Sequence, residues 1–373
     1  MELKIALLPG DGIGPEVTKQ AVKILKAVEK VFGHQFVFEE AHVGAIAIDE
    51  TGNPLPETTL TLCKNSDAVL FGAIGDPKYD NNPDAKVRPE QGLLKLRKEL
   101  GLYANIRPIK AYETLLEKSP LKKNIIEGTD MLIYRELTGG IYFGAKKLSE
   151  DGKTASDLCE YSQYEIERIA HLAFKAAQTR RKKLTLVDKA NVLESSRLWR
   201  RVVTNIATTY PDVTLDFLFV DNAAMQMILN PSQFDVILTE NMFGDIISDE
   251  GSVIGGSIGL LASASVGDKS ALFEPIHGSY PQAKGKNIAN PIAAILSAGM
   301  LLDHFGLYKE GESVRKAVEN TLELNIVTPD LNVVRNFETD YVGDAIANTI
   351  LNNDHTNGYI NHENISIGKS VFI

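Results

Sequence analysis

The chain has 373 residues, and at roughly 150 residues per domain this length predicts two or three domains. Apolar residues make up 44% and charged residues 24%, a balance that excludes a wholly disordered protein. The 39 basic and 49 acidic residues give a net charge of −10, which argues against a general binder of nucleic acid or of anionic membranes.

Cysteine content and hydropathy narrow the class of protein further. Only Cys63 and Cys159 occur, which excludes a disulfide scaffold and a cysteine-based zinc site. The sequence has no stretch of 18 uncharged apolar residues, the length that a membrane-spanning helix needs. The first residues reach Pro9-Gly10 too early for a secretory signal. We therefore expect a cytoplasmic protein.

Short apolar runs alternate with stretches of helical periodicity along the chain. The first strand is expected at Leu3–Leu8, and a helix face follows at steps of four and three: Val17, Ala21, Ile24, Val28 and Val31. Further strands are expected at 68–72, 184–187, 213–220 and 234–238. Helices are expected at 162–181 and 194–209. This alternation is typical of an α/β protein.

Two regions depart from this rhythm. In residues 131–144, two β-rich runs are joined by Thr138-Gly139-Gly140, which predicts a hairpin and a second subdomain. The last 22 residues contain five asparagines and little periodicity, so residues 352–373 are expected to form a surface extension.

Two glycine-rich segments fail as nucleotide-binding motifs. A dinucleotide fingerprint that starts at Gly10 needs glycine at position 15, where Pro15 stands. Between Gly278 and Gly285 lie six residues, whereas a P-loop requires four. The first segment then predicts a strand-to-helix turn, either a turn alone or one that also touches a ligand.

Residues 88–100 have the pattern of an amphipathic helix. Four of them fall at i, i+3, i+4 and i+7 and share one face: Glu90, Leu93, Leu94 and Arg97. An ordinary helix with leucines in the core and charges at its edges would look the same. Together with Arg107 and Arg135, however, Arg97 could bind a dicarboxylate, because the planar guanidinium grips a carboxylate at two points.

Three aspartates predict a site for a hard divalent cation. Asp245 and Asp249 are four residues apart and point the same way on a helix, where like charges are destabilising without a counter-ion. Asp221 closes one expected strand and opens a helix. Oxygen ligands without cysteine or histidine favour Mg²⁺ or Mn²⁺. Surface acids and a helix N-cap are the alternatives.

Lys189 and Tyr142 are candidates for proton transfer. Lys189 directly follows an apolar strand, where desolvation and a nearby cation can lower the pKa of a lysine. An exposed structural lysine is the alternative. Tyr142 follows the Gly-Gly turn and could be a core residue or a proton donor. His277 lies in a loop after a proline, and the other histidines show no ligand spacing.

Six separated motifs, taken in order, resemble the β-decarboxylating hydroxyacid dehydrogenases, the isocitrate/isopropylmalate dehydrogenase type. They are LLPGDGIGPEV, RPEQGLLKLRKEL, YRELTGGIYFG, VDKANVLESSRLWR, NMFGDIISDE and EPIHGSYPQAKGKNIANP. The resemblance covers roughly residues 1–350. It implies a two-domain α/β fold that is not a Rossmann fold, with a cofactor-binding domain of 1–102 plus 256–373 and a dimerisation and substrate domain of 103–255.

The resemblance also assigns roles to the candidate residues. Tyr142 and Lys189 would be catalytic, and a metal ion would be held by Asp221, Asp245 and Asp249. The substrate would be bound by Glu90, Leu93, Leu94, Arg97, Arg107, Arg135 and Val192. A homodimer with shared active sites is implied, in which Lys189 and Asp221 serve the site of the other subunit.

Within this family the motifs are most similar to the branch that acts on 3-isopropylmalate in leucine biosynthesis. Leu93 and Leu94 offer no hydrogen bond to the extra carboxylate of isocitrate, which would be costly to bury there. A sister enzyme acting on malate, tartrate or homoisocitrate is the nearer alternative. A non-catalytic α/β ligand-binding protein is the more distant one, and it would have no need for the lysine, the tyrosine and the acids together.

NAD is the cofactor that the resemblance implies. It would be bound by Ile13, Glu274, His277, Gly278, Ser279, Gln282 and Asn290. Gln282 replaces the aspartate that NAD-using relatives commonly have, so the repulsion of an NADP 2′-phosphate is expected to be weaker. The direction in which Lys284 points is left open by the sequence.

Overall fold

The computed structural model describes residues 1–81 and 85–352. The predicted extension at 352–373 therefore lies, apart from its first residue, outside the described residues. Within the described part, no helix is long and apolar enough to cross a membrane.

A ten-stranded sheet runs through the molecule in the order β2-β1-β3-β12-β11-β4-β5-β10-β8-β9. The strands of its first half are β1 (Glu2–Gly10), β2 (Gln35–Glu40), β3 (Ala68–Ala73), β11 (Ala262–Val266) and β12 (Ala271–Pro275). Those of its second half are β4 (Ala104–Lys110), β5 (Asp130–Glu136), β8 (Lys183–Asp188), β9 (Thr214–Phe219) and β10 (Val236–Thr239). The α/β class and the strands expected from sequence are thus confirmed.

The sheet is parallel at both ends and antiparallel in the middle. Strands β2, β1, β3 and β12 are parallel to one another, and so are β5, β10, β8 and β9. Strands β12, β11, β4 and β5 pair antiparallel. The seam between the halves is the β11–β4 pair, which joins only residues 264–266 to 104–106.

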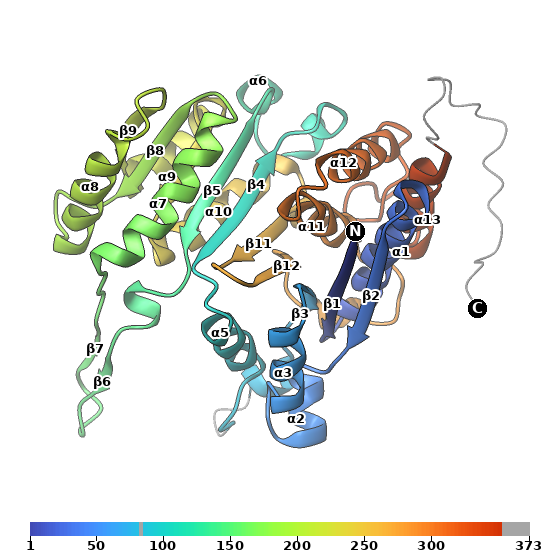
Figure 1. The fold of residues 1–373 in the computed structure, drawn as a ribbon, viewed down its shortest axis with the longest axis horizontal. Helices are drawn as coiled ribbons and strands as arrows, with labels where there is room; N and C mark the ends of the chain where they lie inside the picture. The colour runs from blue at the N-terminus through green and yellow to red at the C-terminus, as the bar shows by residue number, and fades with distance from the viewer. Residues whose placement is uncertain (82–84, 353–373) are drawn as a thin grey trace.

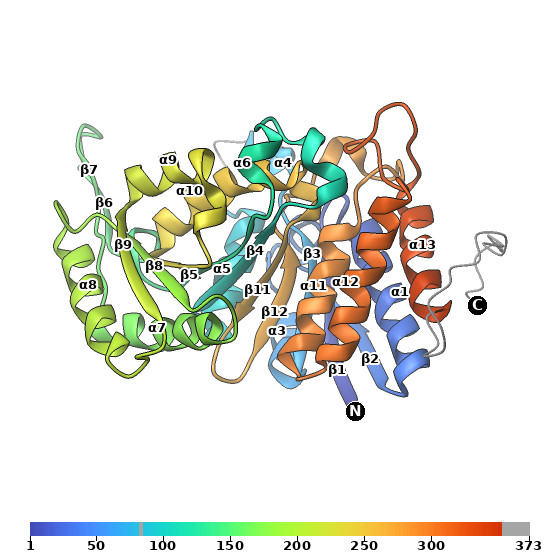
Figure 2. The same cartoon turned by 90° about the horizontal axis from the view of Figure 1, so that it is seen from above.

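Helices cover both faces of the sheet. On the first half, α1 (Gly14–Phe32), α11 (Ile292–His304), α12 (Tyr308–Glu323) and α13 (Thr339–Asn352) pack together, while α2 (Ala45–Thr51), α3 (Glu57–Asn65) and α5 (Pro89–Glu99) lie on the other side (Figure 1). On the second half, α7 (Gln163–Gln178) and α8 (Glu194–Ala207) lie opposite α9 (Val220–Leu229) and α10 (Asn241–Ser252) (Figure 2). Two short helices, α4 (Pro77–Asp80) and α6 (Lys123–Ile126), complete the set.

Helix α1 shows why the sequence pattern was informative. Its predicted apolar face is confirmed, with Val17, Ala21, Ile24 and Val28 fully buried. A proline in the first turn starts the helix, and Gly33 ends it in the left-handed conformation, at φ +73°. The helix packs on the all-buried strand β3 (AVLFGA), as expected for a parallel strand covered on both faces.

The hairpin predicted at 131–144 is wrong. Strand β5 ends at Glu136, and the buried Glu136 carboxylate accepts the backbone N–H groups of Thr138 and Gly139 at 3.0 and 2.7 Å. The chain then turns through Gly140, at φ +74°, into the 3-10 turn η2 (Gly140–Tyr142). The hairpin comes later, where β6 (Lys146–Leu148) pairs with β7 (Ala155–Asp157) and projects from the body (Figure 1).

Candidate active site

Two buried arginines lie side by side in the middle of the sheet. Arg107 is on β4 and Arg135 is on the neighbouring antiparallel strand β5. Asn105 is paired directly with Arg135 and is two residues from Arg107, so all three side chains share one face. The strand register therefore aims both guanidinium groups at the same place, the surface of helix α10.

The two aspartates of α10 meet these arginines. Arg135 Nη1 donates to Asp245 Oδ1, and Arg107 Nη1 donates to Asp249 Oδ1 at 3.2 Å. Arg107 Nη2 also lies 3.6 Å from Asp245 Oδ1. Buried guanidinium groups need such partners, because an unpaired charge in the interior is costly. The i, i+4 spacing of the aspartates thus gives one carboxylate to each arginine.

Burial lowers the pKa of both arginines. Burial and the positive charge of Arg107 together lower the pKa of Arg135 to about 10. The nearby Asp245 carboxylate acts in the opposite direction on each. Both guanidinium groups remain protonated at neutral pH. The site therefore holds two fixed, charged guanidinium groups, each with an aspartate beside it.

Tyr142 reaches the same cluster from the turn η2. Its hydroxyl donates to Asp245 Oδ2 at 3.1 Å, and its ring lies over the Arg135 guanidinium, with 5.9 Å between the Cζ atom and the ring centroid. Its side chain is 41% exposed, so a ligand can reach it. Burial and the negative charge of Asp245 raise the pKa of Tyr142, so the hydroxyl keeps its proton at neutral pH.

The third arginine lies next to the pair but has a different partner. Arg97 on α5 forms an ion pair with Glu274 on β12, at 2.7 Å between Nη2 and Oε1. Arg97 Nε is buried and makes no hydrogen bond. Arg97 and Glu274 also contribute to the charge environment of Arg107. Glu274, expected to contact the cofactor, is therefore paired with an arginine that was expected to bind the substrate.

Glu90 connects the substrate residues to the expected cofactor segment. A Cβ atom added at Gly75 would lie 2.9 Å from Glu90 Oε1 and 3.7 Å from Ser279 Oγ, so both side chains border this glycine. The N–H of Ile13 donates to the Ser279 carbonyl at 2.8 Å. Three of the predicted residues, far apart in sequence, are thus brought close together.

The two leucines of α5 are not equivalent. Leu93 is 9% exposed and packs in a core cluster with Leu8 and Leu55, whereas Leu94 is 44% exposed. Val192 is also exposed, at 61%. Only Leu94 and Val192 are free to contact a ligand, and Leu93 supports α5 from beneath.

Lys189 and Asp221 form an ion pair of their own, with 2.6 Å between Nζ and Oδ1. The hydrogen bond from Lys189 lowers the pKa of Asp221. Asp221 lies in the first turn of α9 and is not its N-cap, which is Phe219. Across residues 1–81 and 85–352, no three acidic, histidine or cysteine side chains gather closely enough to hold a metal ion. A single chain therefore does not bring Asp221 to Asp245 and Asp249.

The segment expected to bind the cofactor forms a loop after β12. His277 Nδ1 donates to the Gly278 carbonyl at 2.9 Å, and His277 Nε2 is buried without a hydrogen-bond partner. Burial lowers the pKa of His277, so its ring is neutral at pH 7. A Cβ atom at Gly278 would meet nothing within 4 Å. The open space at Gly278 suits a ligand, and the buried ring nitrogen of His277 still lacks a partner.

The remaining cofactor candidates are placed less distinctively. The Asn290 amide donates to Asp330 at 3.0 Å and accepts from the N–H of Ile292 at 3.0 Å. Gln282 is exposed on the 3-10 turn η6 (Pro281–Ala283). Lys284 lies close enough to Asp49 for its charge to lower the pKa of that carboxyl, after the stronger effects of Lys78 and Tyr79.

Sequence reasoning missed the residues that orient the arginines. Asn105 Oδ1 accepts from Arg107 Nε at 2.7 Å, and Ser248 Oγ accepts from Arg107 Nη1 at 2.6 Å. Asn241 Oδ1 accepts from two nitrogens of Arg135. The alternation of side chains on a strand could have indicated Asn105, which is two residues from Arg107. The other two depend on how α10 packs against the sheet.

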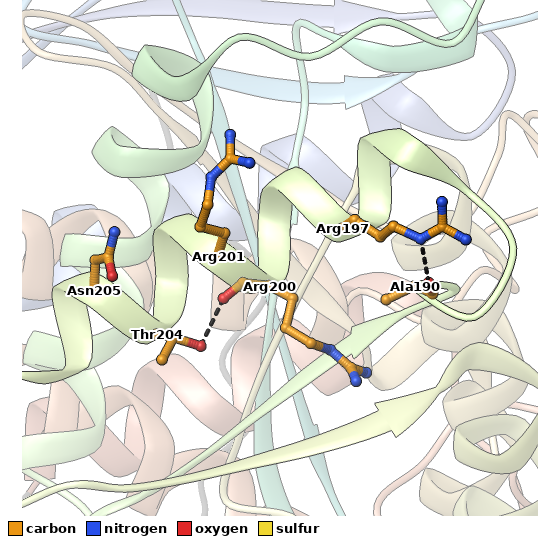
Figure 3. Close-up of a pocket in the computed structure, with 6 residues that line it drawn as sticks. All are labelled: Ala190, Arg197, Arg200, Arg201, Thr204 and Asn205. Carbon is orange, nitrogen blue, oxygen red and sulfur yellow. Dashed lines mark hydrogen bonds between the residues drawn. The ribbon is translucent and has the colours of Figure 1, made fainter.

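A hollow of about 420 Å³ lies along α8, away from this cluster. Figure 3 shows its lining residues: Ala190, Arg197, Arg200, Arg201, Thr204 and Asn205. The three guanidinium groups point in different directions, and two are engaged: Arg197 with Glu194 and Arg200 with Asp188. The hollow therefore lacks the convergent donors of the β4–β5 cluster.

Comparison with known proteins agrees with this arrangement. Residues 4–346 match the family model described as "Isocitrate/isopropylmalate dehydrogenase". The chain belongs to the isocitrate/isopropylmalate dehydrogenase family. This membership confirms the family and the fold expected from the six motifs, and it makes the chain an oxidoreductase.

Individual members of the isocitrate/isopropylmalate dehydrogenase family match over nearly the whole chain. The 3-isopropylmalate dehydrogenase of Bacteroides fragilis is 56% identical, over 94% of this chain and 99% of that protein. The one from Bacillus subtilis is 54% identical, over 89% and 92%. Among solved structures, isocitrate dehydrogenase from Methylococcus capsulatus superposes with a TM-score of 0.84 at 34% identity, covering 94% of this chain and 99% of that one.

Proposed function

We propose that this protein oxidises and decarboxylates 3-isopropylmalate to 4-methyl-2-oxopentanoate, a step of leucine biosynthesis, with NAD as the oxidant. The observation that carries the proposal is the pair of buried arginines on β4 and β5, held beside Tyr142 with an exposed leucine on α5 nearby. The two positive charges match the two carboxylates of the substrate. Relatives described as 3-isopropylmalate dehydrogenases are 51–56% identical to the chain.

Arg97, Arg107 and Arg135 bind the carboxylates in this proposal. Arg107 and Arg135 are fixed by strand register and by neutral acceptors, so little side-chain entropy is lost when the substrate arrives. Leu94 and Val192 contact the isopropyl group, and Leu93 maintains the position of Leu94. Glu90, beside Ser279, lies at the end of the site nearest the nicotinamide.

The donor set fits a divalent cation. Asp245 and Asp249 are partly exposed carboxylates, and Asp221 supplies a third oxygen ligand if it comes from a second subunit. Oxygen-only ligands select Mg²⁺ or Mn²⁺. When bound, the cation withdraws electron density from the substrate oxygen during both oxidation and decarboxylation.

The cofactor loop fits NAD through the unpartnered His277 nitrogen, the open space at Gly278 and the Ser279 segment beside Ile13. When bound, NAD would supply the acceptor for the hydride that leaves C2 of the substrate. Gln282 can bond a ribose hydroxyl through its side-chain oxygen.

Two side chains of the protein move protons. Lys189 removes the proton of the C2 hydroxyl as the C2 hydrogen leaves as hydride, which gives the ketone. Cleavage of the bond between C3 and its carboxylate releases CO₂ and leaves the electron pair as an enolate. Tyr142, kept protonated by its raised pKa, then donates its proton to C3 and completes the product.

A homodimer completes the site in this proposal. Helices α9 and α10 and the residue after α10 expose apolar side chains: Met225, Ile228, Leu229, Ile246 and Val253. Burying this surface against a second copy would be favourable. Asp221 and Asp245 are on the same two helices, so an interface here would bring Lys189 and Asp221 of the partner subunit toward Asp245 and Asp249.

The two free thiols are consistent with a cytoplasmic location.

Formation of NADH with 3-isopropylmalate and Mg²⁺ tests the function. We expect kcat/KM for 3-isopropylmalate to exceed that for isocitrate, malate, tartrate and homoisocitrate. The structural likeness to isocitrate dehydrogenase makes isocitrate the most informative competitor. A preference for any of the other acids would reassign the enzyme to a sister activity.

A further inference from the structure

Asn241 occupies a central position that the mechanism above does not use. It is the first residue of α10, it is 1% exposed, and it follows strand β10 by two residues. Its backbone N–H, which has no partner within the helix, donates to the Tyr161 hydroxyl at 3.0 Å. This bond fixes the start of α10 against the loop before α7. The backbone that carries the Asn241 side chain is therefore held in place.

The two ends of the Asn241 amide bind different parts of the site. Oδ1 accepts from Arg135 Nε at 3.1 Å and from Arg135 Nη2 at 2.9 Å, while Nδ2 donates to the Gly139 carbonyl at 3.2 Å. Rotating the amide by half a turn would place its N–H₂ group against a guanidinium that has only donors. The orientation of the amide is therefore determined at both ends.

Asn241 orients Arg135 without adding a charge to it. The amide oxygen occupies the Nε–Nη2 edge of the guanidinium, which leaves Nη1 to Asp245, while the Tyr142 ring lies against the guanidinium carbon. A carboxylate at the position of the amide would make the same two contacts but would give Arg135 a second negative partner beside Asp245. A neutral acceptor avoids that second negative charge at the substrate site.

The same amide also holds the turn that carries Tyr142. The backbone of Gly139 is fixed at both ends, because its N–H donates to Glu136 at 2.7 Å and its C=O accepts from Asn241. At Gly140, a Cβ atom would lie 2.2 Å from the Tyr161 hydroxyl, so the turn has no room to shift. Asn241 therefore links the carboxylate-binding arginine to the tyrosine.

We propose that Asn241 is a positioning residue that sets Arg135 and Tyr142 relative to one another without placing a second negative charge against Arg135, whose carboxylate partner is Asp245. The inference rests on the proposed function, because it assigns Arg135 and Tyr142 their roles in that reaction. The amide contacts both partners, and its neutrality is essential to the effect.

The test compares Asn241→Asp and Asn241→Ser with wild type, using the full-length dimer. Asn241→Asp keeps the size and the acceptors but adds a negative charge and loses the donor to Gly139, so KM for 3-isopropylmalate should rise about tenfold or more. Asn241→Ser retains one acceptor without charge and should give an intermediate KM. A purely structural role would lower Tm and the active fraction, neither of which changes KM.

Thr239→Val is the matched control. Thr239 is the buried last residue of β10 and is paired with Arg135 on β5, but its hydroxyl donates to the Val187 carbonyl on the opposite neighbouring strand, β8, at 2.9 Å, and valine keeps its size. This variant should lower Tm and leave KM within about twofold of wild type. A wild-type KM in either Asn241 variant would overturn the proposal, as would failure of both to fold, because the amide would then serve the fold alone.

Turnover of 3-isopropylmalate by the wild type tests the proposed function. The ratio of the variant KM to the wild-type KM tests the role of Asn241. A failure of the proposed function and a failure of the Asn241 proposal therefore give different results. If the wild type binds 3-isopropylmalate without turning it over, the proposed function fails. Calorimetric Kd values for 3-isopropylmalate on the same proteins then supply the ratio. A Kd for Asn241→Asp that equals the wild-type value would refute the inference.

Discussion

Lys189 Nζ donates to Asp221 Oδ1 over 2.6 Å, so the proposed base and one proposed metal ligand are already paired within a single chain. An ammonium held by a carboxylate is a poor base. In the proposed site, a cation bound by Asp221 would leave Lys189 with a weaker counter-charge. The proposed dimer would then take part in the chemistry.

Mixed dimers test that sharing. Lys189→Ala and Tyr142→Phe homodimers should each be nearly inactive. In a mixed dimer, one site combines an intact Tyr142 with an intact Lys189 of the partner subunit, and the other site has neither. Refolding the two inactive variants together should restore NADH formation. Recovery that only equals the sum of the two homodimers would place both groups in one chain's site.

Asp245→Asn should remove most of the turnover. A neutral amide is a poorer ligand for Mg²⁺ than a carboxylate, and it also leaves Arg135 with less counter-charge. Excess EDTA should produce a similar loss in wild type, with recovery on adding Mg²⁺ or Mn²⁺. Full activity of the purified enzyme in EDTA would contradict a metal site.

Leu94→Ala and Leu93→Ala should differ in kind. Truncation of the exposed Leu94 should weaken transition-state binding of 3-isopropylmalate by ~1–3 kcal/mol, with less effect on malate. Truncation of the buried Leu93 should instead lower the free energy of unfolding by ~2–5 kcal/mol. The measurements are kcat/KM on both substrates and urea denaturation. Equal losses on both substrates for Leu94→Ala would make it a packing residue.

Gln282→Asp should sharpen the preference for NAD. The added carboxylate would repel the 2′-phosphate of NADP and still accept a ribose hydroxyl. Comparing kcat/KM for the two cofactors, in wild type and variant, measures the change. A wild-type preference for NADP would point to Lys284 as a phosphate ligand.

Glu240→Gln should stabilise the fold at high pH. Burial, together with the charges of Glu136 and Asp188, raises the pKa of Glu240 to about 7, and its Oε2 has no hydrogen-bond partner. A carboxyl whose folded-state pKa is raised contributes stability below pH 4.5, and that stability is lost as pH rises toward 7. The variant should gain on the order of 3 kcal/mol in unfolding free energy at pH 8 relative to wild type.

At pH 4.5 the difference between the two proteins should be small, because Glu240 is then protonated in the folded state and about half protonated in the unfolded state. Urea denaturation at the two pH values measures the difference. An equal gain at pH 4.5 and pH 8 would mean that the titration of Glu240 is not its cause.

The pattern of apolar residues predicted elements such as α1, which buries one continuous face, and β3, which is buried on both faces. Burial alone determines the pattern of such elements. The prediction failed at residues 137–142, where the buried Glu136 carboxylate captures two backbone N–H groups and ends the strand. A side chain that bonds its own following turn leaves no periodic signal.

The site residues show the same division. Arg107, Arg135, Asp245 and Tyr142 were identified from motifs, and the structure brings their side chains together. The sequence could not separate Leu93 from Leu94, since both fall on the predicted inner face of one helix. It also could not indicate Asn241, whose four hydrogen bonds are made to segments 80 to 106 residues away.

The seam between β11 and β4 has a consequence for biosynthesis of the protein. Strands β4, β5, β8, β9 and β10 come from one uninterrupted stretch of chain, whereas β1, β2 and β3 wait for β11 and β12. During synthesis from the N-terminus, the second half of the sheet can form while β3 still has an unpaired edge. That edge is wholly apolar, which makes the nascent chain prone to aggregation until residues 271–275 have left the ribosome.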